Sequence, residues 1–182
     1  MNILMLVGSL RADSWTGHLV GAIPGLLPEG VESEVYAGIG DLPHYDQDLD
    51  TDEAPAAVVA FREAVARADA LVVATPEYNG SVPGVLKNAI DWASRPRGAA
   101  ALGGKPVAVI SVSPSRRGAQ WAREDAVKIL RVAGAEPLEQ SIGVASVHDI
   151  VINGQIADHG VRQALTDLMA DLVSAEQVRP AA

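Results

Sequence analysis

The sequence predicts an open, doubly wound α/β fold in which helices cover both faces of a five-stranded parallel sheet of order 2-1-3-4-5. Short apolar runs, such as residues 3–7 and 106–112, indicate buried strands, because strands covered on both faces are apolar throughout. Helical segments separate these runs, and alternating strands and helices are typical of a parallel sheet covered on both sides. We therefore expect a three-layer sandwich.

Prolines, glycines and polar turns mark the limits of the individual elements. The expected strands are residues 3–7, 31–37, 70–74, 106–112 and 141–145, and the expected helices are residues 17–23, 55–68, 83–92, 119–133 and 158–175. A long loop, residues 38–50, follows the second strand, and the tail 178–182 is expected to be frayed. No repeat, linker or second domain is evident, so residues 1–182 are expected to form a single domain.

Composition limits the classes of function that the chain can have. A chain of 182 residues, 48% of them hydrophobic, can form a sizeable core. The net charge of −9 makes nucleic acid and anionic membranes poor partners, so an anionic ligand needs local cations. The absence of cysteine excludes disulfides, thiol catalysis and thiolate metal sites. There is no basic leader, and no apolar run approaches the roughly 18 residues of a membrane span, so we expect a cytoplasmic protein.

The segment from Gly8 to Thr16 joins the first strand to the first helix and is the strongest candidate for a ligand site. Such a turn directs free backbone N–H groups and the positive end of the helix dipole at one spot, which suits a phosphate. Ser9, Ser14 and Thr16 add hydroxyl donors, and Arg11 adds a positive charge. The alternative is a capped helix start, with Ser14 or Thr16 as the cap. Neither a Gly-x-Gly-x-x-Gly fingerprint nor a P-loop is present.

Two further polar loops follow strands at the same edge of the predicted sheet. Residues 75–84 follow the third strand, and residues 113–118 follow the fourth. In a sheet of order 2-1-3-4-5 the first and third strands flank the point where the strand order reverses, so their loops face each other across one crevice. This arrangement suits a mononucleotide, with its phosphate at the first strand and its ring beside the third.

The acidic segment within residues 46–52 has aspartates at alternate positions, which suggests a calcium loop. The EF-hand pattern fails, because Thr51 stands where the turn needs glycine and Ala57 stands where the bidentate glutamate belongs. We interpret the segment as a solvated acidic loop, and His44 beside it as a surface residue.

Four motifs carry a resemblance to a known family. Gly8-Ser9-Leu10-Arg11-x-x-Ser14-x-Thr16 resembles the Gly-Ser-x-Arg-x-x-Ser-x-Asn motif of the NADPH-dependent FMN reductase family, which includes quinone, chromate and azo reductases of flavodoxin-like fold. Pro76-Glu77-Tyr78-Asn79-Gly80 matches the second motif of that family. Leu42-Pro43-x-Tyr45-Asp46-x-Asp48 and Leu86-Lys87-Asn88-x-x-Asp91-Trp92 are similar to further motifs in the same order. The resemblance therefore covers almost the whole chain.

The resemblance implies an FMN-dependent NAD(P)H oxidoreductase. NADPH or NADH would reduce the flavin, and the electrons would pass to a flavin, a quinone or a similar small-molecule acceptor in a ping-pong scheme. No side chain is assigned as an acid or base, because flavin chemistry does not demand one. The family is commonly dimeric or tetrameric, so a homodimer or homotetramer is expected, and Trp92 is then either a core or an interface residue. The residues implied in FMN binding are Ser9, Leu10, Arg11, Ser14, Trp15 and Thr16 at the phosphate, Pro76, Glu77, Tyr78, Asn79 and Gly80 beside the isoalloxazine ring, and Ser113 in the fourth loop.

Two departures from the family pattern lie in the segments expected to bind the cofactors. Thr16 replaces an asparagine, which keeps a donor on a shorter, β-branched side chain. The fourth loop commonly carries a Gly-Gly pair and here contains Arg116, Arg117, Gly118 and Ala119. The two arginines either favour the 2′-phosphate of NADPH or form a solvated surface pair.

Two other classes of protein compete with the reductase. A flavodoxin-like electron carrier or flavin-binding sensor without turnover would keep both loops but would need no nicotinamide pocket. A phosphate-binding protein without flavin would leave the second loop, residues 75–84, unexplained.

Overall fold

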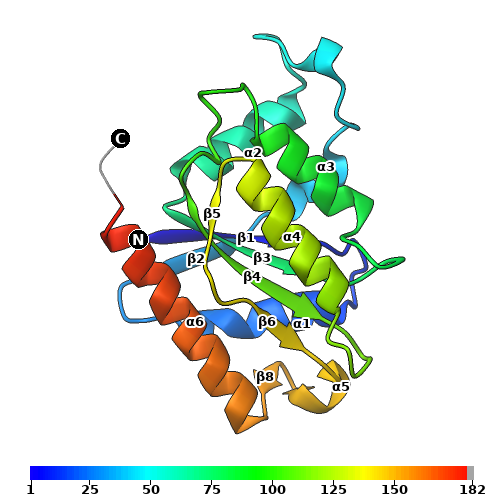
Figure 1. Ribbon diagram of the computed structural model, residues 1–182, viewed down its shortest axis with the longest axis vertical. Helices are drawn as coiled ribbons and strands as arrows, with labels where there is room; N and C mark the ends of the chain where they lie inside the picture. Colours follow the sequence, from blue (N-terminus) through cyan, green and yellow to red (C-terminus); the bar gives the residue numbers. More distant parts are fainter. Residues whose placement is uncertain (180–182) are drawn as a thin grey trace.

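The computed structural model describes residues 1–179 and contains a central parallel sheet (Figure 1). Its strands are β1 Asn2–Val7, β2 Glu32–Val35, β3 Ala70–Thr75, β4 Pro106–Val112, β5 Glu136–Pro137 and β6 Ile142–Val144. The order is β2-β1-β3-β4, and both β5 and β6 pair with β4. Every one of these pairings is parallel, so the predicted 2-1-3-4-5 order of a flavodoxin-like sheet is confirmed.

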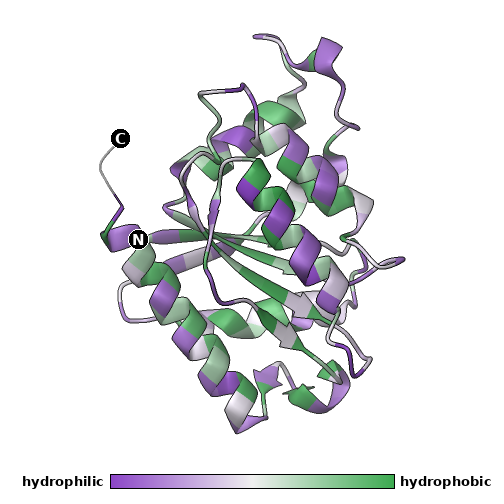
Figure 2. Ribbon diagram, in the orientation of Figure 1, coloured by the Kyte–Doolittle hydropathy of each residue, from purple (hydrophilic) through white to green (hydrophobic). Residues whose placement is uncertain are grey.

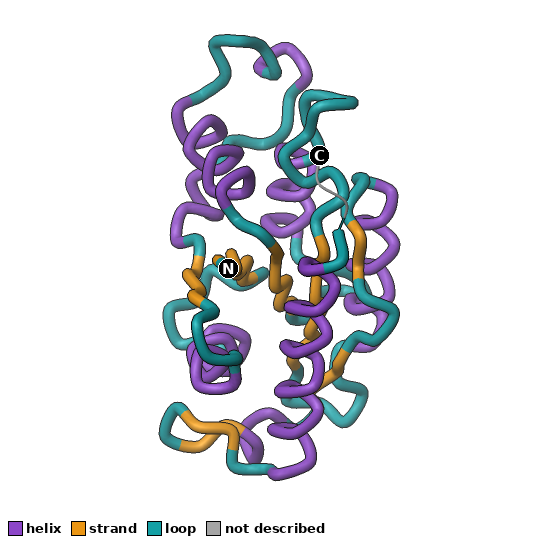
Figure 3. Tube along the Cα trace, turned by 90° about the vertical axis from the view of Figure 1, so that its left-hand side faces the viewer, coloured by secondary structure: helices purple, strands orange, loops and turns teal. Residues whose placement is uncertain are grey.

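Helices cover both faces of the sheet, which confirms the predicted three layers (Figure 3). The helices are α1 Trp15–Ala22, α2 Ala56–Arg67, α3 Gly84–Ala93, α4 Gln120–Val132, α5 Val147–Ile150 and α6 His159–Gln177. One face packs against α2, α3 and α4, and the other packs against α1 and α6 with the short α5. Among residues 1–179, no helix has the length and apolarity needed to cross a membrane.

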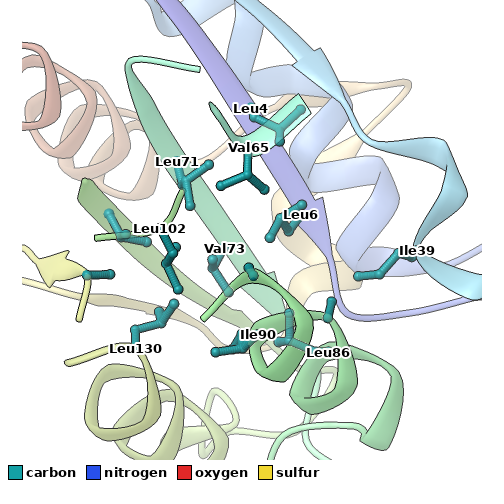
Figure 4. Close-up of a cluster of buried hydrophobic side chains, with 14 of the residues drawn as sticks. Leu4, Leu6, Ile39, Val65, Leu71, Val73, Leu86, Ile90, Leu102 and Leu130 are labelled. Atoms are coloured by element: carbon teal, nitrogen blue, oxygen red, sulfur yellow. The ribbon is translucent and has the colours of Figure 1, made fainter. Parts of the chain in front are cut away.

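The strands supply both halves of the core because alternate residues point to opposite faces. Leu4 and Leu6 of β1 lie in the cluster under α2, α3 and α4, whereas Ile3, Met5 and Val7 lie in the cluster under α1 and α6. Figure 4 shows the first cluster, and Figure 2 shows the apolar strands enclosed by helices with polar outer faces. The unbroken apolar runs of the sequence are the direct consequence of this double burial.

The fifth position of the sheet differs from the single strand predicted at residues 141–145. Two short strands share it: β5 pairs with the start of β4, and β6 pairs with its end. Pro137 ends β5, and since proline has no N–H to donate, a ladder that continues through it loses one bond. Only β6 corresponds to the predicted strand.

The segment between β6 and α6 was not predicted in detail and contains a small hairpin. Its strands are β7 Val151–Ile152 and β8 Gln155–Ile156, joined by Asn153 and Gly154 with φ of 50° and 74°. Two positive φ angles are the requirement of a two-residue type I′ turn, for which Asn-Gly is preferred. Strands this short carry too little alternation to be recognised in the sequence. The last residues of the predicted frayed tail, 180–182, lie outside the described residues.

The long segment after β2 is not irregular throughout, and α3 holds it in place. It contains two 3-10 helices, Ala37–Asp41 and Gln47–Leu49. The Asn88 side chain accepts a hydrogen bond from Tyr45 N (2.7 Å) and donates to Pro43 O (2.9 Å), and Trp92 Nε1 donates to the same carbonyl (2.8 Å). Trp92 is fully buried, so it belongs to the core of this chain. The third and fourth family motifs therefore form one structural unit.

We predict that Asn88→Ala lowers the free energy of unfolding by about 1–3 kcal/mol, because it leaves the Tyr45 N–H without its partner. The measurement is urea-induced unfolding followed by circular dichroism. Gln163→Ala is the matched control, because Gln163 makes a hydrogen bond to Asp167 on the exposed surface of α6. A loss no larger than that of the control would show that the Asn88 contacts do not stabilise the fold.

Candidate functional site

Three loops follow the carboxyl ends of the central strands and meet at one edge of the sheet (Figure 1). We name them the β1 loop (residues 8–14), the β3 loop (residues 76–83) and the β4 loop (residues 113–119). The first two touch at Gly8, whose N–H donates to Ala74 O (2.8 Å). A β-carbon at this position would lie 3.2 Å from Leu86 Cδ2, 3.3 Å from Ala74 O and 3.4 Å from Pro76 Cδ. A side chain here would therefore push the two loops apart by a few tenths of an ångström, and glycine allows the close approach.

The β1 loop ends in the capped start of α1 and leaves backbone donors free. Ser14 Oγ accepts from Gly17 N (3.0 Å), so the capping interpretation of Ser14 is correct. Among the residues that the structure describes, Trp15 and Thr16 N–H make no hydrogen bond, and they stand at the positive end of the helix dipole. Arg11 is exposed beside them. Because the cap uses only an acceptor site of Ser14, its hydroxyl proton can still be donated to an anion.

Two neighbours in the β1 loop have different surroundings. Ser9 Oγ accepts a long hydrogen bond from Arg11 N (3.4 Å), which turns the loop back on itself. The Leu10 side chain is exposed and rests on Gly40, where a β-carbon would lie 3.0 Å from Leu10 Cδ2.

The β3 loop contains a two-residue turn that projects Tyr78. Asn79 and Gly80 have φ of 52° and 78°, and Tyr78 and Ser81 exchange two backbone hydrogen bonds of 3.0 and 3.2 Å. This is the geometry of a type I′ turn, for which Asn-Gly is preferred. The backbone conformation of the turn therefore explains why Asn79 and Gly80 occupy it. The side chain of Tyr78, which precedes the turn, is 48% exposed.

Glu77 connects the β3 loop to α4. Its Oε2 accepts from Trp121 N (3.0 Å) and Ala122 N (3.2 Å), two free donors of the first turn of α4. Ala119, at the N-cap position of α4, has no side-chain acceptor, so Glu77 caps this helix from another loop. The sequence places Glu77 in the right loop but does not indicate this contact.

A second connection runs from the same loop to α4. Ser81 Oγ donates to Asp125 Oδ2 (2.7 Å), and Lys128 Nζ donates to Asp125 Oδ1 (2.6 Å). The bonds from Lys128 and Ser81 hold the pKa of Asp125 below its ordinary value, against a smaller effect of burial. Asp125 is therefore an anchor for the β3 loop and stays ionised at neutral pH.

The β4 loop is held largely by its own serines. Ser113 Oγ accepts from Ser115 N (3.0 Å) and lies 2.9 Å from Ser115 Oγ, and Ser111 Oγ donates to Gly118 O (2.5 Å). Gly118 and Ala119 both adopt left-handed backbone, with φ of 59° and 53°. This conformation explains why the family pattern has Gly-Gly here, and Ala119 is strained in it.

The β1 loop and the start of α1 offer hydrogen-bond donors for an anion, and the β3 loop offers a rigid polar turn. Among residues 1–179, no group of three or more His, Asp or Glu side chains is placed to hold a metal ion. Asp46 caps its own turn, and Asp50 pairs with Arg62 at 2.6 Å, so the acidic loop has structural partners. A cavity of about 690 Å³ lies elsewhere, between α3, the segment that follows it and the end of α4. None of the residues that line this cavity belongs to the three loops.

The fold is flavodoxin-like, and two polar loops come together at the point where the strand order reverses. The model of the NADPH-dependent FMN reductases matches residues 1–149, and the chain belongs to this family.

Similar proteins are known from sequence and from structure. A 2-hydroxy-1,4-benzoquinone reductase from Burkholderia sp. is 49% identical over 113 residues, which are 62% of this chain and 61% of that protein. An NAD(P)H-dependent FMN reductase from Pseudomonas aeruginosa is 36% identical over 91% of this chain and 89% of its own length. The flavoenzyme NAD(P)H:(acceptor) oxidoreductase FerB from Paracoccus denitrificans has a structure that superposes with a TM-score of 0.86, at 34% identity and 98% coverage of both chains.

We predict that Glu77→Ala lowers the free energy of unfolding by about 1–2 kcal/mol, since it removes the cap of α4. Glu77→Gln should lose less, because its amide oxygen can still accept from the same two N–H groups. Thermal unfolding of both variants measures the difference. Equal stability of Glu77→Ala and the parent protein would contradict the capping role.

Proposed function

We propose that this protein is an FMN-dependent NAD(P)H oxidoreductase that reduces a quinone, a flavin or a related small-molecule acceptor. The observation that carries the proposal is the contact at Gly8, which brings the β1 loop, with its donors for a phosphate, against the start of the β3 loop at Pro76. Membership of the NADPH-dependent FMN reductase family supports the same assignment.

The residues present suit FMN. Its phosphate is a dianion, and the β1 loop and the first turn of α1 together offer two free N–H groups, three hydroxyl groups and the Arg11 guanidinium. We assign phosphate binding to Ser9, Leu10, Arg11, Ser14, Trp15 and Thr16, and the ring environment to Pro76, Glu77, Tyr78, Asn79, Gly80 and Ser113. Glu77 acts there as a positioning residue, because its carboxylate holds α4. Bound FMN supplies the two-electron chemistry, while the protein binds and orients it and excludes competing reactions.

The reaction partners follow from the family and from the names of the relatives. NADPH or NADH is the donor, in line with the NAD(P)H-dependent reductase from Pseudomonas aeruginosa. A quinone is the preferred class of acceptor, since the Burkholderia relative is named a benzoquinone reductase. The chain spans about three fifths of that relative, so the acceptor is inferred from the shared part.

We further propose that residues 1–182 form one domain, that the protein is cytoplasmic, and that it assembles as a homodimer or homotetramer. The expectation of assembly rests on the family resemblance and not on Trp92, which is buried within the chain. Light scattering at micromolar concentration tests it. A stable mass near 18.9 kDa would end the idea.

The visible spectrum of the purified protein tests the function. The protein, alone or after addition of FMN, should be yellow, and anaerobic NADPH or NADH should bleach the colour. Colour that persists with both donors would favour an electron carrier or a sensor. No binding of added FMN would exclude all three flavin-dependent functions.

We predict that Arg11→Ala weakens FMN binding on the order of tenfold or more, because it removes a charge-assisted contact to the phosphate worth roughly 1.5–3 kcal/mol. The fold should persist, since Arg11 is exposed in a loop. Fluorescence titration with FMN measures the effect. Arg67→Ala, an exposed arginine in the last turn of α2, is the control. Unchanged affinity in Arg11→Ala would place the phosphate elsewhere.

We also predict ping-pong kinetics, with the nicotinamide leaving before the acceptor enters the same space. Initial rates with varied NADPH at several fixed quinone concentrations should give parallel double-reciprocal lines. Tyr78, half-exposed at the mouth, shapes this shared space, so Tyr78→Ala should slow both half-reactions. Intersecting lines would mean that both substrates bind together, and a defect confined to one half-reaction would remove Tyr78 from the shared space.

A further inference from the structure

A cationic, aromatic surface adjoins the proposed site and has no role in the phosphate cradle. It is formed by Arg116 and Arg117 of the β4 loop and by Trp121 in the first turn of α4, and we name it the Arg–Trp cluster. Among residues 1–179, neither arginine forms an ion pair, and both are exposed. Trp121 is 53% exposed, which is unusual for a large aromatic side chain.

Hydrogen bonds fix the backbone that carries the cluster. Ser115 O accepts from Ser146 N (3.2 Å), and the Ser111 hydroxyl holds the carbonyl of Gly118. Glu77 fixes the backbone of Trp121 to the β3 loop. The two arginines therefore project from a fixed loop, and less ordering is needed when they bind a ligand.

The Trp121 ring is fixed against the site as well. A β-carbon at Gly80 would lie 3.4 Å from Trp121 Cε3, so the indole rests on the turn that carries Tyr78. The Arg117 Cζ atom lies 5.4 Å from the centroid of the same ring. An aromatic face and a guanidinium group are thus already placed together beside the mouth of the proposed flavin site.

This combination selects a particular ligand chemistry. Unpaired arginines in a chain of net charge −9 attract an anion, and guanidinium groups match phosphate oxygens with paired hydrogen bonds. The part of the half-exposed indole that Arg117 and Gly80 leave uncovered can stack with a planar base. A purine that carries a phosphate close to its ribose satisfies both features at once.

We propose that the Arg–Trp cluster binds the adenosine 2′-phosphate end of NADPH. Trp121 stacks with the adenine, and Arg116 and Arg117 bind the 2′-phosphate. NADH lacks this phosphate, so the cluster makes the protein prefer NADPH. The inference rests on the proposed function, since it names the donor of that same reaction.

The first experiment compares the two donors on the flavin-loaded protein. Anaerobic bleaching of the flavin is measured with NADPH and with NADH for the parent, the double variant Arg116→Ala/Arg117→Ala, and Trp121→Ala. The double variant should lower the ratio of NADPH to NADH efficiency by about tenfold or more. Trp121→Ala should weaken both donors, because both carry adenine. Arg131→Ala, an exposed arginine in the last turn of α4, is the matched control and should leave the ratio unchanged.

The second experiment measures binding without turnover. Adenosine 2′,5′-bisphosphate should bind the flavin-loaded parent more tightly than 5′-AMP in calorimetry, and the double variant should remove this difference. Circular dichroism confirms that each variant is folded. Equal affinity of the two nucleotides, or a parent without preference for NADPH, would overturn the inference. If neither donor bleaches the flavin, the proposed function fails, and the nucleotide titration still decides whether the cluster binds the 2′-phosphate.

Discussion

The close approach of the β1 loop to the end of β3 is the constraint on which the candidate site depends. Gly8 hydrogen-bonds to Ala74, and any side chain at this position would press on backbone and on Leu86 and Pro76. Because glycine allows the contact, the two loops meet at the point where the strand order reverses. The β1 loop, which leads to the free N–H groups of α1, thereby contacts the start of the loop that carries Tyr78.

Side-chain contacts join the remaining parts of the site to this central contact. Glu77 caps α4 from the β3 loop, and Ser81 reaches Asp125 one turn further along the same helix. The start of α4, with Trp121, is therefore positioned by the loop that carries the second family motif. A change at Glu77 should consequently alter stability and the environment of Trp121 together, although Glu77 has no acid–base role in the proposed chemistry.

Binding of anionic ligands to this protein depends on a few nearby arginines and not on its overall charge. The chain carries a net charge of −9, so the overall field does not favour anionic cofactors or donors. Arg11, Arg116 and Arg117 lie in loops at the carboxyl edge of the sheet, where the proposed flavin phosphate and nucleotide phosphate would bind. Since charges are screened over about 10 Å at 0.1 M salt, cations in direct contact with the ligand can outweigh distant acidic groups. Phosphate affinity then depends on these few side chains.

The sequence by itself determined the sheet order, the layers and the three loops. Strands buried on both faces appear as unbroken apolar runs, and the loops that connect them contain residues with strong turn preferences. It also determined the family, through long motifs that match in order. The tertiary structure decided what individual motif residues do: Glu77 caps α4, and Asn88 and Trp92 hold Pro43 and Tyr45 in the segment after β2. It also divided the edge position of the sheet between β5 and β6. These contacts join residues dozens of positions apart, and local patterns of polarity carry no information about such pairs. The place of Trp121 beside Gly80 and Arg117 depends on the packing of α4 against the β3 loop, which only the folded chain defines.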